Sequence, residues 1–512
     1  MFNKIFIVVA IISMLTISCR GATTPKINLY PNKVVTSDFI GNGVQWSAYP
    51  HADSPTAEWG LLMTNAKWDR VFTRLDYMKP ALVRVIDQAN WRYLKGFDKN
   101  DDPVLDFTSP EVKTLEKLLN YCQKNNISVL LGEWGCPYQV HDQSPELTGK
   151  FSGANDSRWS NIIVRFLDYL INQKKFTCIK YYNLVNEPNG DWASTKGNWD
   201  EWSAGIETLK LALEKAGLAD KISIAGPDVV AHYDNPHSQY TGIEWVSESV
   251  KHLNNSLGIF DIHAYTNYDM VRSGEFTELY RKVAKTTKPT GKPIIFSEIG
   301  FNRDTPANQA RVKKDKYSSE DSQMSVYDFS YGIDMADALI QIMNAGYSSA
   351  LAWALDDAMH TKDDKGERNQ LKRWGFWNSL GTELCNDPED EKIRPWFYTW
   401  SLMCRYFPAG FNVIKSDETG IDGLRLVAGM KNSAITIAII NNAENSRKLN
   451  LKLEGLTAKK IFKKYIYSEK TSPVDENGFP IPLEKGIANQ TSVGLSVDIP
   501  ANSFILYTTL DF

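Results

Sequence analysis

Cysteine is scarce in this chain, and its distribution argues against the usual structural uses of the residue. The sequence has six cysteines among 512 residues, with irregular spacing and no C-x-x-C pair. Setting Cys19 apart leaves an odd number, five. The pattern speaks against a disulfide framework or a zinc site and predicts buried free thiols.

An excess of charge of either sign is also missing. Lysine and arginine together number 57 and aspartate and glutamate 61, which gives a formal net charge of −4. This balance gives no reason to expect nucleic acid or an anionic membrane surface as a partner. The sequence contains no H-E-x-x-H motif, P-loop or dinucleotide-binding fingerprint, so we expect neither a metal nor an organic cofactor.

Long hydrophobic runs are confined to the N-terminus. Residues 1–19 combine Lys4, the apolar stretch IFIVVAIISMLTIS and Cys19. The stretch has about 14 residues, too few to span a bilayer, and fits the hydrophobic region of a signal peptide. LTISC resembles a loose bacterial lipobox, in which the cysteine is lipidated, although Thr16 stands where leucine is usual. We therefore expect an exported lipoprotein of the bacterial cell envelope, in the periplasm or at the outer-membrane surface and anchored only through Cys19, with plain secretion as the alternative.

Strand-like and helix-like segments alternate over residues 39–403, which we interpret as one large domain. The eight predicted strands cover residues 39–46, 81–86, 127–135, 181–187, 222–227, 259–265, 292–298 and 349–355. They are continuously apolar, as strands buried on both faces are. Segments 109–126, 158–175 and 331–346 repeat apolar residues at the helical spacing. The pattern predicts a (β/α)8 barrel, or TIM barrel, with a doubly wound open sheet as the alternative.

The C-terminal part of the chain has a different pattern. Residues 404–512 alternate apolar and polar positions, as in LRLVAGMKNSAITIAIINN, with turn signals such as NNAEN between the runs. This alternation predicts an antiparallel β-sandwich domain. Residues 20–38, which contain KINLYPNKVV, are a candidate for a further strand of that sandwich.

Two of the predicted barrel strands end on a glutamate. Glu187 closes YYNLVNE, directly before a proline that ends the strand ladder, and Glu298 closes KPIIFSE. In a (β/α)8 barrel the C-terminal ends of the strands form the active face, so strands four and seven would place these carboxylates across one mouth. Glycoside hydrolysis requires such a pair of carboxyl groups.

The arrangement resembles the glycoside hydrolases of clan A, which share a (β/α)8 barrel with an acid/base glutamate after strand four and a nucleophilic glutamate after strand seven. The match at Asn-Glu-Pro is a specific one, and the resemblance covers essentially the whole barrel. It implies that Glu187 is the acid/base and Glu298 the nucleophile. It also implies that Asn186 binds the 2-hydroxyl of the sugar and that Arg84, in VRVI, pairs with the nucleophile.

The resemblance extends to two further strands. His263 and Tyr265, in DIHAYTNY, match a pair that lines the catalytic subsite, and Trp353, in LAWAL, matches a tryptophan that forms the floor under the sugar. Other residues at strand ends are weaker candidates. Glu133 is either a substrate-binding or a structural group, and the aromatic candidates for sugar stacking are Trp46, Trp91, Trp134, Trp192, Trp374 and Trp377.

The resemblance implies hydrolysis of a β-linked glycan with retention of anomeric configuration. A barrel with a C-terminal sandwich is similar to the xylosidase/iduronidase-type, glucosylceramidase/xylanase-type and some cellulase-type families. NEPN favours the first of these and SEIGF the last, so the family, the sugar and exo or endo action stay open, as does the oligomeric state. The alternative is a carbohydrate-binding lipoprotein on a degenerate barrel, which would commonly lack one of the two glutamates.

Overall fold

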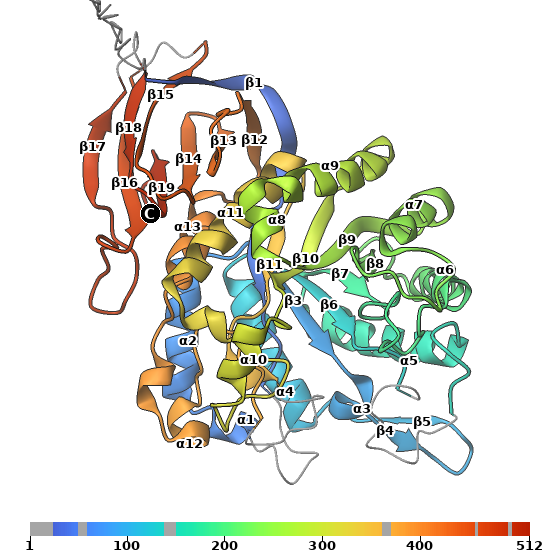
Figure 1. The fold of residues 1–512 in the computed structure, drawn as a ribbon. Coiled ribbons are helices and arrows are strands. Elements are labelled where there is room, and N and C mark those ends of the chain that lie inside the picture. The colour runs from blue at the N-terminus through green and yellow to red at the C-terminus, as the bar shows by residue number, and fades with distance from the viewer. Residues whose placement is uncertain (1–23, 50–58, 138–149, 361–369, 456–458, 490–493) are drawn as a thin grey trace, which may run out of the picture.

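The larger domain is a closed barrel of eight parallel strands (Figure 1). The computed structural model describes residues 24–49, 59–137, 150–360, 370–455, 459–489 and 494–512. In chain order the barrel strands are β2 (Gly43–Gln45), β3 (Leu82–Asp87), β6 (Ser128–Glu133), β7 (Ile179–Asn183), β8 (Ser223–Val230), β9 (Leu257–Thr266), β10 (Ile294–Phe301) and β11 (Ala350–Ala352). The predicted (β/α)8 fold is confirmed, and the open-sheet alternative is wrong.

Helices follow the strands and cover the outside of the barrel (Figure 1). They are α2 (Asn65–Met78), α4 (Pro110–Lys124), α5 (Ser157–Asp168), α6 (Trp199–Lys215), α7 (Gly242–Leu253), α9 (Glu275–Thr287), α11 (Phe329–Ala345) and α13 (Phe397–Tyr406). Local sequence sets their ends. The Ser109 hydroxyl accepts a bond from the Val112 amide at the start of α4, and Gly346 ends α11 in the left-handed conformation.

Shorter elements lie in the loops that leave the strands. They are α1 (Trp59–Leu62), α3 (Ala89–Arg92), β4 (Leu94–Phe97), β5 (Pro103–Leu105), α8 (Tyr268–Ser273), α10 (Pro306–Val312) and α12 (Gly381–Cys385). Inside the barrel, six buried side chains form a separate apolar layer: Leu82, Leu130, Ala225, Ile259, Ile295 and Leu351. This layer fills the interior, so the space for a ligand lies above it, at the C-terminal ends of the strands.

The second domain is a nine-stranded, mostly antiparallel sheet folded into a sandwich, as predicted. Its strands are β1 (Lys26–Phe39), β12 (Phe411–Ser416), β13 (Leu424–Lys431), β14 (Ala434–Asn441), β15 (Arg447–Leu453), β16 (Ile461–Ser468), β17 (Glu484–Ala488), β18 (Leu495–Ile499) and β19 (Ser503–Thr508). The N-terminal strand β1 pairs antiparallel with β12 and parallel with β15, so it joins the two parts of this sheet.

The sandwich packs on the barrel beside α11 (Figure 1). Arg425 of β13 forms an ion pair with the buried Asp337 of α11 at 2.7 Å, and the Tyr467 hydroxyl donates to the Phe329 carbonyl at 2.9 Å. The domains are therefore joined by polar contacts of defined geometry as well as by apolar packing.

The five cysteines of the described residues are free and buried, which confirms the prediction of buried thiols. Cys19 and the rest of the predicted signal segment lie outside the described residues. Among the residues that the structure describes, no helix combines the length and the apolar character needed to cross a membrane.

Candidate active site

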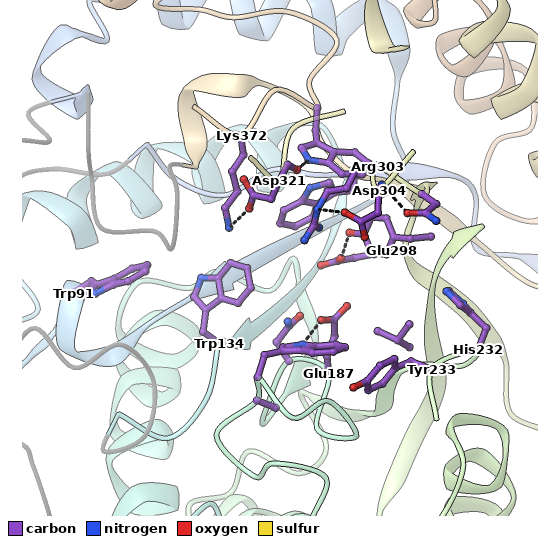
Figure 2. A pocket seen from close by; sticks show the side chains of 18 residues that line it. Trp91, Trp134, Glu187, His232, Tyr233, Glu298, Arg303, Asp304, Asp321 and Lys372 are labelled. Atoms are coloured by element: carbon purple, nitrogen blue, oxygen red, sulfur yellow. Dashed lines mark hydrogen bonds and ion pairs between the residues drawn. The ribbon is translucent and has the colours of Figure 1, made fainter. Parts of the chain in front are cut away.

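A pocket of about 580 Å³ opens at the C-terminal ends of the barrel strands. Its lining includes both predicted catalytic glutamates, and several tryptophans surround them (Figure 2). The predicted residues found on its wall are Asn186, Glu187, Tyr265, Glu298, Trp91, Trp134, Trp192, Trp353 and Trp374. Arg84 and His263 lie directly behind this wall and contact the glutamates from within the barrel.

Glu187 is placed by a short irregular segment after β7. The strand ends at Asn183, four residues before the end that the sequence predicted. The chain beyond it is fixed by its neighbours: the Asn186 amide donates to the Glu133 carbonyl at 3.0 Å, and the Glu187 amide donates to the Asp228 carbonyl at 3.1 Å. Glu187 itself has a φ of 49°, a left-handed conformation that is uncommon for a residue with a side chain and is enriched at functional sites.

Glu298 lies within β10 and is almost completely buried. Its Oε1 forms an ion pair with Arg84, and its Oε2 accepts a 2.5 Å hydrogen bond from the Tyr265 hydroxyl. Burial raises the pKa of the Glu298 carboxyl, whereas the neighbouring His263 and Arg84 cations lower it and partly offset the effect. The partners expected for Glu298 are therefore in contact with it.

His263 connects the two glutamates to a third acid. Its Nδ1 donates to Glu187 Oε1 at 2.8 Å and lies 3.5 Å from Glu298 Oε2, while its Nε2 donates to Asp228 Oδ1 at 2.8 Å. Burial alone would lower the pKa of His263, but the carboxylates of Glu298, Asp228 and Glu187 outweigh it and raise the pKa to about 10. The imidazole is therefore a cation at neutral pH, with both nitrogens protonated.

The two candidate catalytic carboxyl groups are close together. One donor atom each from Glu187, His263 and Glu298 lie within 4.8 Å of one another. The same three side chains could hold a metal ion only if His263 lost the proton on Nδ1. One carboxyl oxygen each of Glu187 and Glu298 are therefore near enough to contact the same sugar residue.

Asp228 is a central residue of the site that the sequence analysis missed. Its Oδ2 accepts from Arg84 at 2.6 Å, its Oδ1 accepts from His263, and the Arg84 guanidinium also donates to Asn186 Oδ1 at 2.9 Å. The strand prediction stopped at Pro227, but β8 continues through Asp228 to Val230. An acidic residue directly after an otherwise apolar strand was the available signal.

Three of the weaker sequence candidates are structural residues outside the pocket. Trp46 is fully buried and packs edge-on against Tyr121 at 5.8 Å, so the expectation of substrate binding is wrong for it. Glu133 accepts hydrogen bonds from the hydroxyls of Tyr93 and Tyr182 at 3.0 and 3.2 Å. Trp377 is buried too, and its indole Nε1 donates to the buried carboxylate of Asp356 at 2.9 Å.

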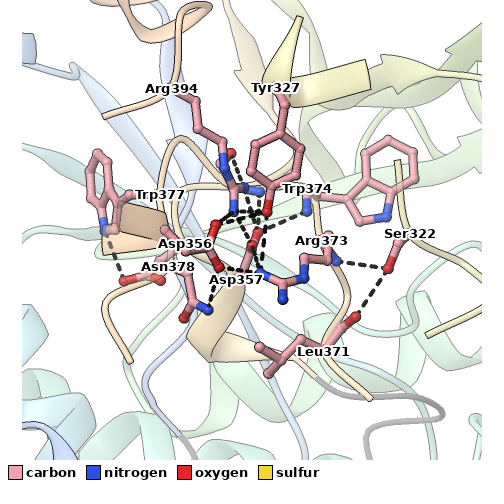
Figure 3. Close-up of polar contacts among 12 residues, drawn as sticks. Ser322, Tyr327, Asp356, Asp357, Leu371, Arg373, Trp374, Trp377, Asn378 and Arg394 are labelled. Atoms are coloured by element: carbon pink, nitrogen blue, oxygen red, sulfur yellow. Dashed lines mark hydrogen bonds and ion pairs between the residues drawn. The ribbon is translucent and has the colours of Figure 1, made fainter. Parts of the chain in front are cut away.

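A buried ion cluster holds Trp374 and Gly375, which follow β11 in the chain, beside the pocket (Figure 3). Asp357 accepts from the backbone amides of Trp374 and Gly375 at 2.9 and 2.7 Å, and Arg394 donates to the same carboxylate at 3.0 Å. The ring of Trp374 then lies edge-on to Tyr265 at 5.4 Å. The backbone of Trp374 and Gly375 is thus fixed by Asp357, and Trp374 forms part of the pocket wall.

No protein-family model and no curated protein matches the chain by sequence. Solved structures match its fold over nearly its whole length. A glycoside hydrolase family 30 subfamily 8 xylanase from Clostridium acetobutylicum has a TM-score of 0.60 at 11% identity, covering 94% of this chain and 99% of that one. A GH39 β-xylosidase from Caulobacter crescentus gives 0.57 at 14% identity, covering 95% and 100%.

A family 51 α-L-arabinofuranosidase from Bifidobacterium longum gives a TM-score of 0.61 at 12% identity, covering 95% of this chain and 100% of that one. At such identities the likeness concerns the fold, and all three proteins are clan A glycoside hydrolases. The resemblance to clan A is therefore confirmed at the level of architecture, including the sandwich beside the barrel.

Proposed function

We propose that the protein is a retaining glycoside hydrolase that cleaves β-glycosidic bonds of an oligo- or polysaccharide. The observation that carries the proposal is the pair of carboxyl groups, Glu187 and Glu298, within 4.8 Å of each other in an aromatic pocket at the barrel mouth. The fold likeness to xylanases, xylosidases and arabinofuranosidases supports the same class of reaction.

The reaction would proceed by double displacement. A carboxylate oxygen of Glu298 attacks the anomeric carbon, the bond from that carbon to the glycosidic oxygen breaks, and the proton of Glu187 passes to the departing oxygen. A covalent glycosyl ester on Glu298 results. Glu187, now a carboxylate, takes a proton from a water molecule whose oxygen attacks the anomeric carbon, which releases the sugar and restores both carboxyl groups.

The neighbouring residues have roles that follow from their contacts. Arg84 and Tyr265 both bond the carboxylate of Glu298 and would hold it in line for attack. Asn186 is fixed by Arg84 beside the acid, where its amide nitrogen can reach a sugar hydroxyl. Trp353 lines the pocket and would form the floor under the sugar.

The decisive test begins with a screen of aryl β-glycosides and of plant and host polysaccharides. Wild-type protein should release reducing sugar, and NMR of the first product should show the anomeric configuration of the substrate. A 2-deoxy-2-fluoro glycoside should label the peptide that contains Glu298. Glu298→Gln should abolish turnover, whereas Glu133→Gln, a buried glutamate at a neighbouring strand end but outside the pocket, should retain it.

Binding of glycans without turnover by the wild-type protein would contradict hydrolysis and would establish the carbohydrate-binding alternative. Inversion of configuration would contradict the assignment of Glu298 as the nucleophile.

We also propose that the protein is exported and anchored in the cell envelope by a lipid on Cys19. The support is the sequence of residues 1–19. Metabolic labelling with a fatty acid in a bacterial host should label the wild-type protein and not Cys19→Ala. Equal labelling of the two would refute the anchor.

A further inference from the structure

One aromatic side chain of the pocket is unusually exposed. Trp192 is 51% exposed, whereas most large aromatic residues of the described chain are buried. It lines the pocket, and its indole Nε1 donates to Glu187 Oε2 at 2.7 Å. A large apolar ring left in water beside a functional carboxyl group is more typical of a binding surface than of the core.

Neighbouring residues fix the position of the Trp192 ring. A Cβ atom at Gly190 would lie 2.4 Å from the indole, so only glycine leaves room for the ring at this distance. Tyr233, another pocket residue, lies 4.7 Å from the Trp192 ring, and its hydroxyl donates to Asp191 at 3.1 Å. Two aromatic rings from the segments after β7 and β8 are thus held together at one edge of the pocket.

The pocket has aromatic walls on opposite sides of the glutamates. In Figure 2, Trp91 and Trp134 lie at one end, Tyr233 and His232 at the other, and Glu187 and Glu298 between them. Trp353 contacts Trp134 edge-on at 6.4 Å and so belongs to the first end. A saccharide that passes between the glutamates therefore meets aromatic side chains on both sides of the bond to be cleaved.

We propose that Trp192 and Tyr233 form the subsite for the leaving sugar, a pyranose ring whose C–H face packs on the Trp192 indole. The inference rests on the proposed glycosidase function and adds the orientation in which the saccharide binds across the pocket. The proton donor, Glu187, must contact the glycosidic oxygen, so the leaving sugar lies on its side of the pocket. The sugar that becomes attached to Glu298 lies at the end formed by Trp134 and Trp353.

The hydrogen bond between Trp192 and Glu187 gives the subsite a second role. His263 occupies Oε1 of Glu187, so the oxygen able to protonate a leaving group is Oε2, which the Trp192 indole contacts in the free protein. When the glycosidic oxygen approaches Oε2, the indole N–H must give up or share this bond. Binding of a sugar in this subsite is thereby coupled to breaking the hydrogen bond between Trp192 and Oε2 of Glu187, the oxygen that donates the proton.

The test compares substrates that do and do not place a sugar in this subsite. An oligosaccharide of the sugar found in the screen fills it, and the corresponding glycosyl fluoride, whose leaving group is a single atom, does not. Trp192→Ala should lower the ratio of kcat/KM for the oligosaccharide to that for the fluoride about tenfold, a difference of ~1.4 kcal/mol. Trp134→Ala, at the other end of the pocket, is the matched control and should lower both values in parallel.

A second measurement addresses Trp192 in the absence of turnover. Binding of the oligosaccharide to Glu298→Gln should change the tryptophan fluorescence, and Trp192→Phe in the same background should reduce that change, whereas an undiminished change would show that the saccharide does not contact Trp192. Circular dichroism and Tm verify that each variant is folded.

Two outcomes would overturn the subsite, and they differ in what they say of the function. Equal losses on both substrates in Trp192→Ala would refute the subsite while leaving the glycosidase function intact. Absence of hydrolysis by the wild-type protein on every substrate of the screen would refute the proposed function and the subsite together.

Discussion

Replacement of Asp228 by asparagine should release the proton of His263 near neutral pH. In the wild-type protein the imidazolium lies between Asp228 and the two glutamates, and its pKa is raised to about 10. Asparagine has the same shape as aspartate but removes one negative charge that directly contacts the ring. The variant therefore isolates the electrostatic contribution of a single buried carboxylate.

The expected magnitude follows from the distance between the charges. Unit charges about 4 Å apart interact by about 4 kcal/mol at an effective dielectric constant of about 20. At 1.36 kcal/mol per unit this corresponds to about three pKa units, so the pKa of His263 should fall from about 10 to about 7 in Asp228→Asn.

The sign of the effect on stability follows from linkage. In the wild-type protein the folded pKa of His263 lies above the unfolded value of 6.5. Its contribution to stability is complete below pH 6.5 and is lost as the pH rises through about 10. In Asp228→Asn the folded pKa of about 7 would lie close to the unfolded value, so little of this contribution would remain to be lost above pH 7, and its Tm should fall over pH 7–9 by less than that of the wild type.

The assay is an NMR titration of histidine-labelled protein over pH 5–10.5, with the His263 resonance assigned from a His263→Asn sample. Asp261→Asn is the control, because burial and the neighbouring Asp228 raise the pKa of Asp261 to about 8, so this side chain is already uncharged at neutral pH. A His263 resonance that titrates at the same pH in Asp228→Asn and the wild type would refute the reasoning.

Four further substitutions probe the site and the fold. Tyr265→Phe removes a charge-assisted hydrogen bond to the proposed nucleophile and should lower kcat about 10- to 100-fold with little change in Tm; a kcat within twofold of wild type would contradict the role. Arg425→Leu leaves Asp337 buried without its cation and should cost about 3 kcal/mol in urea unfolding, whereas an unchanged midpoint would show that the ion pair does not hold the domains. Trp46→Ala should lower the free energy of unfolding by about 3–5 kcal/mol, while KM measured at low temperature should stay constant; a raised KM would show that Trp46 contributes to substrate binding. Leu130→Ala, within the barrel, should cost about 2–5 kcal/mol in the same unfolding assay, and a cost below ~1 kcal/mol would mean that the inner layer is not closely packed.

The sequence was sufficient for the architecture because the barrel strands are buried on both faces and therefore continuously apolar. The same property made the proposed catalytic pair recognisable in the sequence, since Glu187 and Glu298 interrupt apolar runs at corresponding strand ends. The residues at which the strands end were harder to predict from the sequence. β7 stops at Asn183 and β8 continues to Val230, because pairing with the neighbouring strands sets these limits, and hydropathy does not report pairing.

Side-chain direction at the strand ends could not be predicted either. Trp46 and Trp134 each follow directly on a barrel strand, yet Trp46 packs among helix residues and Trp134 lines the pocket. Successive side chains of a strand point to opposite faces, so a shift of one residue exchanges core and pocket. Glu133, one residue before Trp134, accordingly points away from the pocket and bonds Tyr93.

Charge balance explains why the missed residue, Asp228, belongs to the site. The buried cations are Arg84 and His263, and the acids in contact with them are Asp228, Glu298 and Glu187. When Glu187 carries the proton that it would donate, two cations face two carboxylates and the cluster is neutral. Without Asp228 the same state would carry one uncompensated positive charge among almost completely buried side chains, and loss of the His263 proton is the least costly way to remove it. Asp228 therefore keeps His263 charged, and a charged His263 can donate to Glu187 in its carboxylate form, the form that must activate water in the second half of the proposed reaction.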